Sequence, residues 1–155
     1  TPAMKVASDL MSIPSFEKAD ESVLFTVEKE HIKKLKKTIL MTAGKAAQHF
    51  AMEIEKEQEV LMNLADMVID VYTAESAILR AEKLALQNGE EKAQYQIVMS
   101  KLFLYSSIKN CQRCGEEVIL SFTEGDEQRM LLMGLIAITI GGTIIYIVIN
   151  KLEDE

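Results

Sequence analysis

A long uninterrupted helical pattern occupies the middle of this sequence. Residues 57–87 contain neither glycine nor proline over about eight helical turns. Apolar side chains recur there at helical spacing and form one stripe: Val60, Leu64, Met67, Val71 and Ile78, widened by Leu61, Val68 and Leu79. Because such a stripe must be buried against other elements, the pattern predicts one long helix of a bundle.

Two further long helices are predicted on either side of this segment. The first runs from about Val23 to Lys56, with Asp20 or Ser22 as its cap. Asn88-Gly89 ends the middle helix, and Asn88 also begins the next helix, which extends from about Glu90 to Phe122. The two helices that meet at this short turn should form an antiparallel hairpin.

Glycine and other small residues mark places where these helices bend or come close to a neighbour. Gly44 lies in a small-residue cluster that suits close helix approach, and Gly115 is a candidate bend. The expected apolar side of the third helix comprises Val98, Leu102, Tyr105, Ile108 and Ile119. Thr123 and Asp126 have capping-box-like spacing before a fourth helical segment that starts at Glu127.

The predicted fold class is therefore all-α, an up-and-down bundle of three to four long helices. We expect the bundle to span residues 22–134, after an irregular linker or short helix over residues 1–21. An apolar segment with an acidic end follows over residues 135–155. Because the chain begins with Thr1, we expect a fragment or a processed product.

The apolar segment permits three structures. Residues 130–149 are uncharged and long enough for a transmembrane helix. Isoleucine, valine and threonine residues flank Gly141-Gly142, which is typical of a β-hairpin. A buried helix that closes the bundle is the third alternative.

The charge and the cysteine content limit the class of protein. The net charge of −7 argues against a nucleic-acid partner. Residues 1–45 hold eight lysines against six acidic residues, whereas the remainder is strongly acidic. Two cysteines and no signal peptide at the start indicate a cytoplasmic setting, and the apolar segment leaves membrane association open.

Few residues carry recognisable chemistry, and we assign no catalytic, cofactor-binding or metal-binding residue. Cys111 and Cys114 form a C-x-x-C motif inside a predicted helix, where we expect ordinary packing thiols. His31 and His49 are about 27 Å apart on a continuous helix and cannot share a metal ion. We interpret His31 as a partly buried structural histidine.

Two charged features have both a structural and a functional interpretation. Lys33, Lys34, Lys36 and Lys37 form the only basic cluster, which is either a solvated face or a contact for anionic lipid or an acidic partner. Glu75 lies on the apolar stripe, where a carboxylate is expensive to bury unpaired. We expect Glu75 to form an inter-helix ion pair or hydrogen bond, rather than to act as an acid or base.

Four stretches together resemble one known family. They are TPAMKVASDLMSIPSF, KKTILMTAGKAAQHF, EQEVLMNLADMVIDVYTAESAILRAEKL and EGDEQRMLLMGL. From about Glu28 to Leu135 the chain resembles the extra C-terminal helical domain of very-long-chain-type acyl-CoA dehydrogenases, particularly the bacterial members. After Gly134 the sequence departs from the pattern of that family.

The resemblance implies a parent enzyme that oxidises acyl-CoA to 2-enoyl-CoA with bound FAD and a glutamate base, in fatty-acid β-oxidation. The segments that hold the flavin and the glutamate lie upstream in this family, so no cofactor is expected in this chain and no catalytic residue is carried over. The implied partner is the catalytic core of a homodimeric parent, and mitochondrial relatives are associated with membranes. A membrane-associated interaction module without enzymatic role is the alternative.

Overall fold

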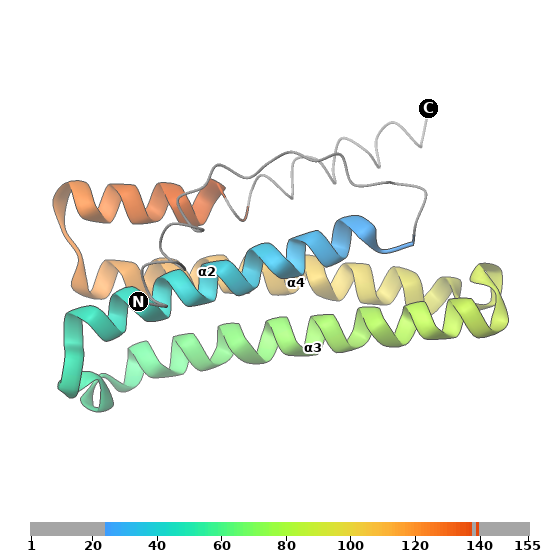
Figure 1. Cartoon of the computed structure of the whole chain (residues 1–155), viewed down its shortest axis with the longest axis horizontal. Helices are drawn as coiled ribbons and strands as arrows, with labels where there is room; N and C mark the ends of the chain where they lie inside the picture. The colour runs from blue at the N-terminus through green and yellow to red at the C-terminus, as the bar shows by residue number, and fades with distance from the viewer. Residues whose placement is uncertain (1–23, 138, 140–155) are drawn as a thin grey trace, which may run out of the picture.

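Three long antiparallel helices form the body of the molecule in the computed structural model, which describes residues 24–137 and 139. Helix α2 spans Thr26–Phe50, α3 spans Gln58–Asn88 and α4 spans Glu90–Phe122, and a short 3₁₀ helix, η1, spans Ala51–Lys56. Residues 125–137 are also helical and pack over α2 and α4 (Figure 1). The all-α, up-and-down prediction is confirmed.

The turn between α3 and α4 lies where the sequence placed it. Gly89 has φ 88°, a backbone conformation that is strained for other residues, and its N–H donates to the Ala85 carbonyl at 2.9 Å. Asn88, however, is the last residue of α3 rather than the cap of α4, because Gly89 takes the capping position. Glu90 and Glu91 then place negative charge at the positive end of the α4 dipole.

The first helix is shorter than predicted at both ends. Phe25 adopts a left-handed conformation just before α2, and its ring is fully buried, which offsets that backbone strain. At the other end, Ala51 has φ 47°, so the α-helix stops at Phe50 and the chain continues as η1. Gly44 does not interrupt α2.

The apolar core follows the predicted stripe of α3 only in part. Met67, Val71 and Ile78 are buried, but Leu61, Val68 and Leu79, which were expected to widen the stripe, are exposed. The expected apolar side of α4 is also partly wrong, because Val98 and Leu102 face solvent whereas Ile108 and Ile119 are buried. The residues that α4 buries are mostly small: Ala93, Ser100, Leu104, Ser107, Ile108, Cys111, Cys114, Gly115, Val118 and Ile119.

Small side chains let α3 and α4 pack closely along their whole length. Ala93, Ser100, Ser107 and Cys114 recur every seven residues on α4, and α3 buries Ala74, Ala81 and Ala85. Close backbones bring many atoms within van der Waals range at once. Because the contact with α3 favours small side chains, the buried side of α4 could not be predicted from its large apolar residues such as Val98 and Leu102.

The fourth helical segment starts at Gly125 and not at Glu127. The Thr123 hydroxyl donates to the Ile119 carbonyl at 2.6 Å, and the Gln128 amide donates to the Thr123 carbonyl, so the expected capping box is not formed. Leu131 and Leu135 are buried against Ile119.

The described part of the apolar segment, up to Ala137 and again at Thr139, is helical, so the first strand of the β-hairpin alternative is not formed there. No helix in the described ranges is both long and apolar enough to cross a membrane. The predicted linker 1–21, the candidate caps Asp20 and Ser22, and residues 140–155 lie outside the described residues.

Candidate functional site: inter-helix polar contacts and exposed apolar faces

Glu75 has the inter-helix partner that its position on the stripe predicted. Its Oε1 lies 2.7 Å from Nζ of Lys36, so the pair joins α3 to α2. The Glu75 side chain keeps 35% of its surface exposed. About two turns along each helix, Lys29 and Glu82 form a second ion pair between the same two helices. These two pairs set the antiparallel register of α2 against α3.

A more deeply buried carboxylate belongs to Glu28, which the sequence analysis did not single out. Its side chain is only 7% exposed, and its Oε1 forms an ion pair with Nζ of Lys101 at 3.1 Å, which joins α2 to α4. Glu28 lies one heptad before Leu35, on the apolar stripe of its helix. The argument applied to Glu75 would therefore have identified it.

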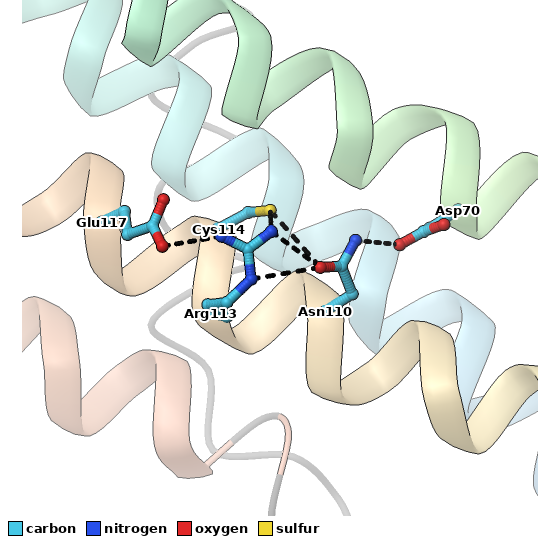
Figure 2. A network of polar contacts seen from close by, with 5 residues as sticks. All are labelled: Asp70, Asn110, Arg113, Cys114 and Glu117. Atoms are coloured by element: carbon cyan, nitrogen blue, oxygen red, sulfur yellow. Dashed lines mark hydrogen bonds and ion pairs between the residues drawn. The ribbon is translucent and has the colours of Figure 1, made fainter.

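A polar network joins α3 to α4 in the middle of the hairpin. The Asn110 amide donates to Asp70 Oδ2 at 2.6 Å, and Asn110 Oδ1 accepts from the Arg113 guanidinium at 2.9 Å (Figure 2). Glu117 accepts from Arg113 at 2.7 Å, and this hydrogen bond raises the pKa of Arg113. Every member has a partner, and Arg113 and Glu117 are largely exposed. The network fixes helix register and leaves no group free for catalysis.

The two thiols of the C-x-x-C motif are buried, and their surroundings favour the unreactive protonated form. Cys111 and Cys114 are both free thiols without exposed surface, and Cys111 Sγ donates to the Met67 carbonyl at 3.8 Å. Burial, with Asp70 and Cys114 adding to it, raises the pKa of Cys111 to about 12, and burial also raises the pKa of Cys114. A redox pair needs the opposite shift toward a stable thiolate. The thiols therefore pack between helices, as predicted.

The two histidines have structural surroundings. His31 is buried, and its pKa is lowered first by that burial and then by the charge of Lys34. His49 lies at the end of α2, where its ring centroid is 4.8 Å from that of Phe50 and 5.0 Å from that of Phe122. No group of three potential metal ligands occurs in the part of the chain that the structure describes.

The basic cluster is a solvated face with partial pairing. Lys33, Lys36 and Lys37 are exposed, and Lys33 pairs with Glu30 at 2.6 Å. Within the described ranges, neither Lys34 nor Lys37 forms an ion pair.

An exposed apolar face extends over the outer side of α2 and α3, and we name it the α2–α3 face. Its residues lie at helical intervals from the Lys36–Glu75 pair, so they point to the same side of the two helices. Large exposed side chains contribute most of it: Leu61, Val68, Tyr72, Leu79 and Leu86 from α3, and Leu40 from α2. The exposed Gly44 and Ala47 of α2 complete it.

A second group of exposed apolar side chains lies on the first half of α4. It comprises Tyr95, Val98, Met99, Leu102 and Phe103. Isolated exposed apolar residues are ordinary on soluble domains, whereas runs of this kind mark contact surfaces. We therefore treat the α2–α3 face and this group on α4 as the two candidate contact surfaces among the described residues.

Two grooves lie along the described helices. One of about 180 Å³ lies between α2 and α3 and is lined partly by Lys29, Ile32 and Glu75. Another, of about 480 Å³, lies along one side of α3 near Arg80 and Lys83. All buried side-chain polar atoms in the described ranges have a hydrogen-bond partner. None of them is therefore an unpaired donor or acceptor that a ligand would satisfy.

Comparison with known proteins identifies this arrangement of helices. A family model described as acyl-CoA dehydrogenase, C-terminal domain, matches residues 34–136. The chain belongs to this family. A probable acyl-CoA dehydrogenase of Bacillus subtilis (strain 168) is 38% identical over 112 residues, which are 72% of this chain and 19% of that protein.

A solved structure shows the same fold. The acyl-CoA dehydrogenase from Bacillus anthracis, crystallised in complex with FAD, matches with a TM-score of 0.81 and 33% identity. The match covers 88% of this chain and 23% of that one. The acyl-CoA dehydrogenase domain described here thus spans about a fifth of the length of these relatives.

FAD does not fit the described residues of this domain. A dinucleotide is usually held by a glycine-rich turn at a helix N-terminus and by a deep cleft. Here neither groove has a glycine among its lining residues, and the buried side-chain polar atoms of the described residues are already paired. We therefore assign no step of flavin chemistry to these residues.

Proposed function

We propose that this chain is the C-terminal helical domain of a longer FAD-dependent acyl-CoA dehydrogenase and that it contributes no catalytic residue. The longer enzyme would oxidise acyl-CoA to 2-enoyl-CoA in fatty-acid β-oxidation, with its flavin held outside this chain. One observation carries the proposal: the two matches cover 88% and 72% of this chain but only 23% and 19% of the relatives.

The role of the domain is to pack on the catalytic core and stabilise it. The two exposed apolar surfaces support this role. In a domain without a partner, polar side chains at these positions would improve solubility, whereas a contact surface needs apolar ones. We further propose that the parent enzyme is a homodimer in the cytoplasm. The apolar group on α4 provides a surface for a second subunit, and sedimentation of the longer polypeptide tests this part.

The flavin content of two purified proteins tests the proposal. One is this chain and the other is the natural polypeptide that contains it. We expect one flavin per longer polypeptide, seen as visible absorbance that bleaches when an acyl-CoA is added. The isolated chain should carry no flavin. Flavin bound stoichiometrically to the isolated chain, or a longer polypeptide without flavin, would contradict the proposal.

A membrane surface is a second candidate contact for this domain. It is supported by the exposed lysines of α2, which lie close to the exposed Leu40. Co-sedimentation with vesicles rich in anionic lipid tests it, with neutral vesicles as the control. Binding that is equal for both vesicle types, or absent from both, would count against an electrostatic contact through Lys33, Lys36 and Lys37.

A further inference from the structure

We propose that the α2–α3 face is the surface by which this domain docks on the catalytic portion of its own polypeptide, and that its occupant there is an amphipathic helix. The inference rests on the proposed function, because it needs an upstream portion of the chain. Beyond that function, the inference specifies which face of the domain makes the contact and which kind of element binds to it.

The spacing on α3 is that of a helix-packing seam. Leu61, Val68, Tyr72, Leu79 and Leu86 follow one another at steps of seven, four, seven and seven residues. Steps of this kind hold apolar side chains in one line along a helix and suit a second helix laid beside it. From Leu61 to Leu86 the line is about 38 Å long. The occupant is therefore a helix of several turns rather than a loop.

The α2 side of the same face allows a close approach. A Cβ added at Gly44 would meet no atom within 4 Å, and Ala47, three residues further on, is exposed. This is the small-residue cluster that the sequence analysis assigned to helix contact. No described element covers Gly44. The partner that the cluster suits must come from another part of the protein.

Charge restricts the occupant further. Lys33, Lys36 and Lys37 lie on the α2 side near Glu75 and Leu79, and Lys37 has no ion pair in the described part of the chain. Because Lys36 pairs with Glu75, these lysines lie beside the middle of the line from Leu61 to Leu86. An occupant that carries an acidic residue near its middle and apolar residues on either side of it matches this arrangement.

The length of the relatives favours the same polypeptide as the source of this helix. About four-fifths of each matched protein lies outside the region that this chain covers. A covalently linked partner has an effective concentration in the millimolar range, which free partners in solution rarely reach. A tethered helix therefore occupies the face in preference to a second copy of the domain.

Thiol labelling at two neighbouring positions tests this docking. Val68 lies on the face and is 52% exposed, whereas Ile69 is 59% exposed and points about 100° away around α3. The variants Val68→Cys and Ile69→Cys are therefore matched in side chain and exposure. Each is made in the isolated chain and in the longer polypeptide. The buried Cys111 and Cys114 give a low background, measured on the unsubstituted proteins.

We expect both new thiols to react at similar rates in the isolated chain. In the longer polypeptide the thiol at position 68 should react about tenfold more slowly, and the thiol at position 69 should not change. Protection at position 69 alone would mean that the domain docks by another face, which overturns this inference and leaves the proposed function intact. Unchanged labelling at both positions would show that the α2–α3 face stays uncovered in the longer polypeptide, which also overturns this inference.

The dependence of the labelling rate on protein concentration tests the alternative occupant, which is a second copy of the domain. If labelling at position 68 slows as the isolated chain is concentrated, a second copy covers the face and the inference fails. The variant Gly44→Leu gives an independent readout. It should leave the melting temperature of the isolated chain unchanged or higher and lower that of the longer polypeptide. An equal effect on the two proteins would overturn the close approach at Gly44.

Discussion

Leu135 packs directly over Gly115. A Cβ at position 115 would lie 2.9 Å from Cδ1 of Leu135 and 3.5 Å from Cε of Met67, and Leu135 is itself fully buried. The position of Gly115 in the sequence suggested a bend or an interruption, but α4 continues through it from Glu90 to Phe122. Gly115 removes a side chain so that the helical segment 125–137 can approach α4. A residue near the end of the family match thus belongs to the core of the domain.

This contact predicts opposite effects for two helical glycines. Gly115→Ala should destabilise the domain by about 1–2 kcal/mol, because the new methyl group displaces a buried leucine in a tightly packed core. Gly44→Ala should stabilise the isolated chain by up to about 1 kcal/mol, because alanine is the better helix former and the site is open. Urea unfolding monitored by circular dichroism measures both, and a stabilising Gly115→Ala would contradict the contact.

The two carboxylates that join α2 to its neighbours should differ in their effect on stability. Glu28→Ala removes a buried carboxylate and leaves Lys101, whose side chain is 33% exposed, without this partner, so it should cost about 2 kcal/mol. Glu75→Ala removes a half-exposed pair and should lower the melting temperature only slightly, for a cost of less than about 1 kcal/mol. Double-mutant cycles with Lys101→Ala and Lys36→Ala separate the pair energies from the loss of packing.

Burial of His31 predicts a loss of stability in mild acid. Its pKa is lower in the folded chain than the ordinary value of 6.5, so the unfolded chain binds the proton more readily. The contribution of His31 is therefore fully present above about pH 6.5 and declines as the pH falls below that value. Unfolding free energies measured between pH 5 and pH 8 should show this slope.

The matched control for that experiment is the other histidine. His31→Gln should remove the part of the slope that His31 contributes, whereas His49→Gln should retain it, because His49 is exposed. If both variants keep the full slope, acidic groups rather than His31 are responsible for it.

The buried cysteines predict a folded protein that resists thiol reagents. At pH 8 neither thiol should react with a disulfide reagent on the timescale on which a free thiol does, because burial raises both pKa values and that of Cys111 to about 12. Two thiols per chain should react once the protein is unfolded in guanidinium. Rapid reaction of the native protein would show that the pair is accessible and would reopen a redox role.

The sequence predicted the local features of this fold well. The end of α3 and the start of α4 follow from Gly89, whose positive φ favours glycine, although Asn88 is not the cap of α4. The inter-helix partner of Glu75 was also predicted, because an isolated carboxylate on an apolar stripe needs one. The identity of that partner, Lys36, was not predictable, since it depends on the register of α2 against α3.

Which apolar residues are buried was predicted less well. Periodicity placed Val68, Leu79, Val98 and Leu102 on apolar sides that the structure leaves exposed. Hydrophobicity favours the largest side chains, whereas close packing of α3 on α4 selects the small ones. The sequence pattern also cannot distinguish a stripe that faces the core of the domain from one that faces a separate partner.

The sequence by itself determined the helical class, the hairpin of α3 and α4 and the family, because these depend on local spacing and on residues that can be compared along the chain. Only the tertiary structure decided which face of each helix is buried and that no described element covers the α2–α3 face. Burial is set by contacts between residues that are distant in sequence. The same helical spacing of apolar residues fits a stripe that faces the core of the domain and a stripe that faces another part of the protein.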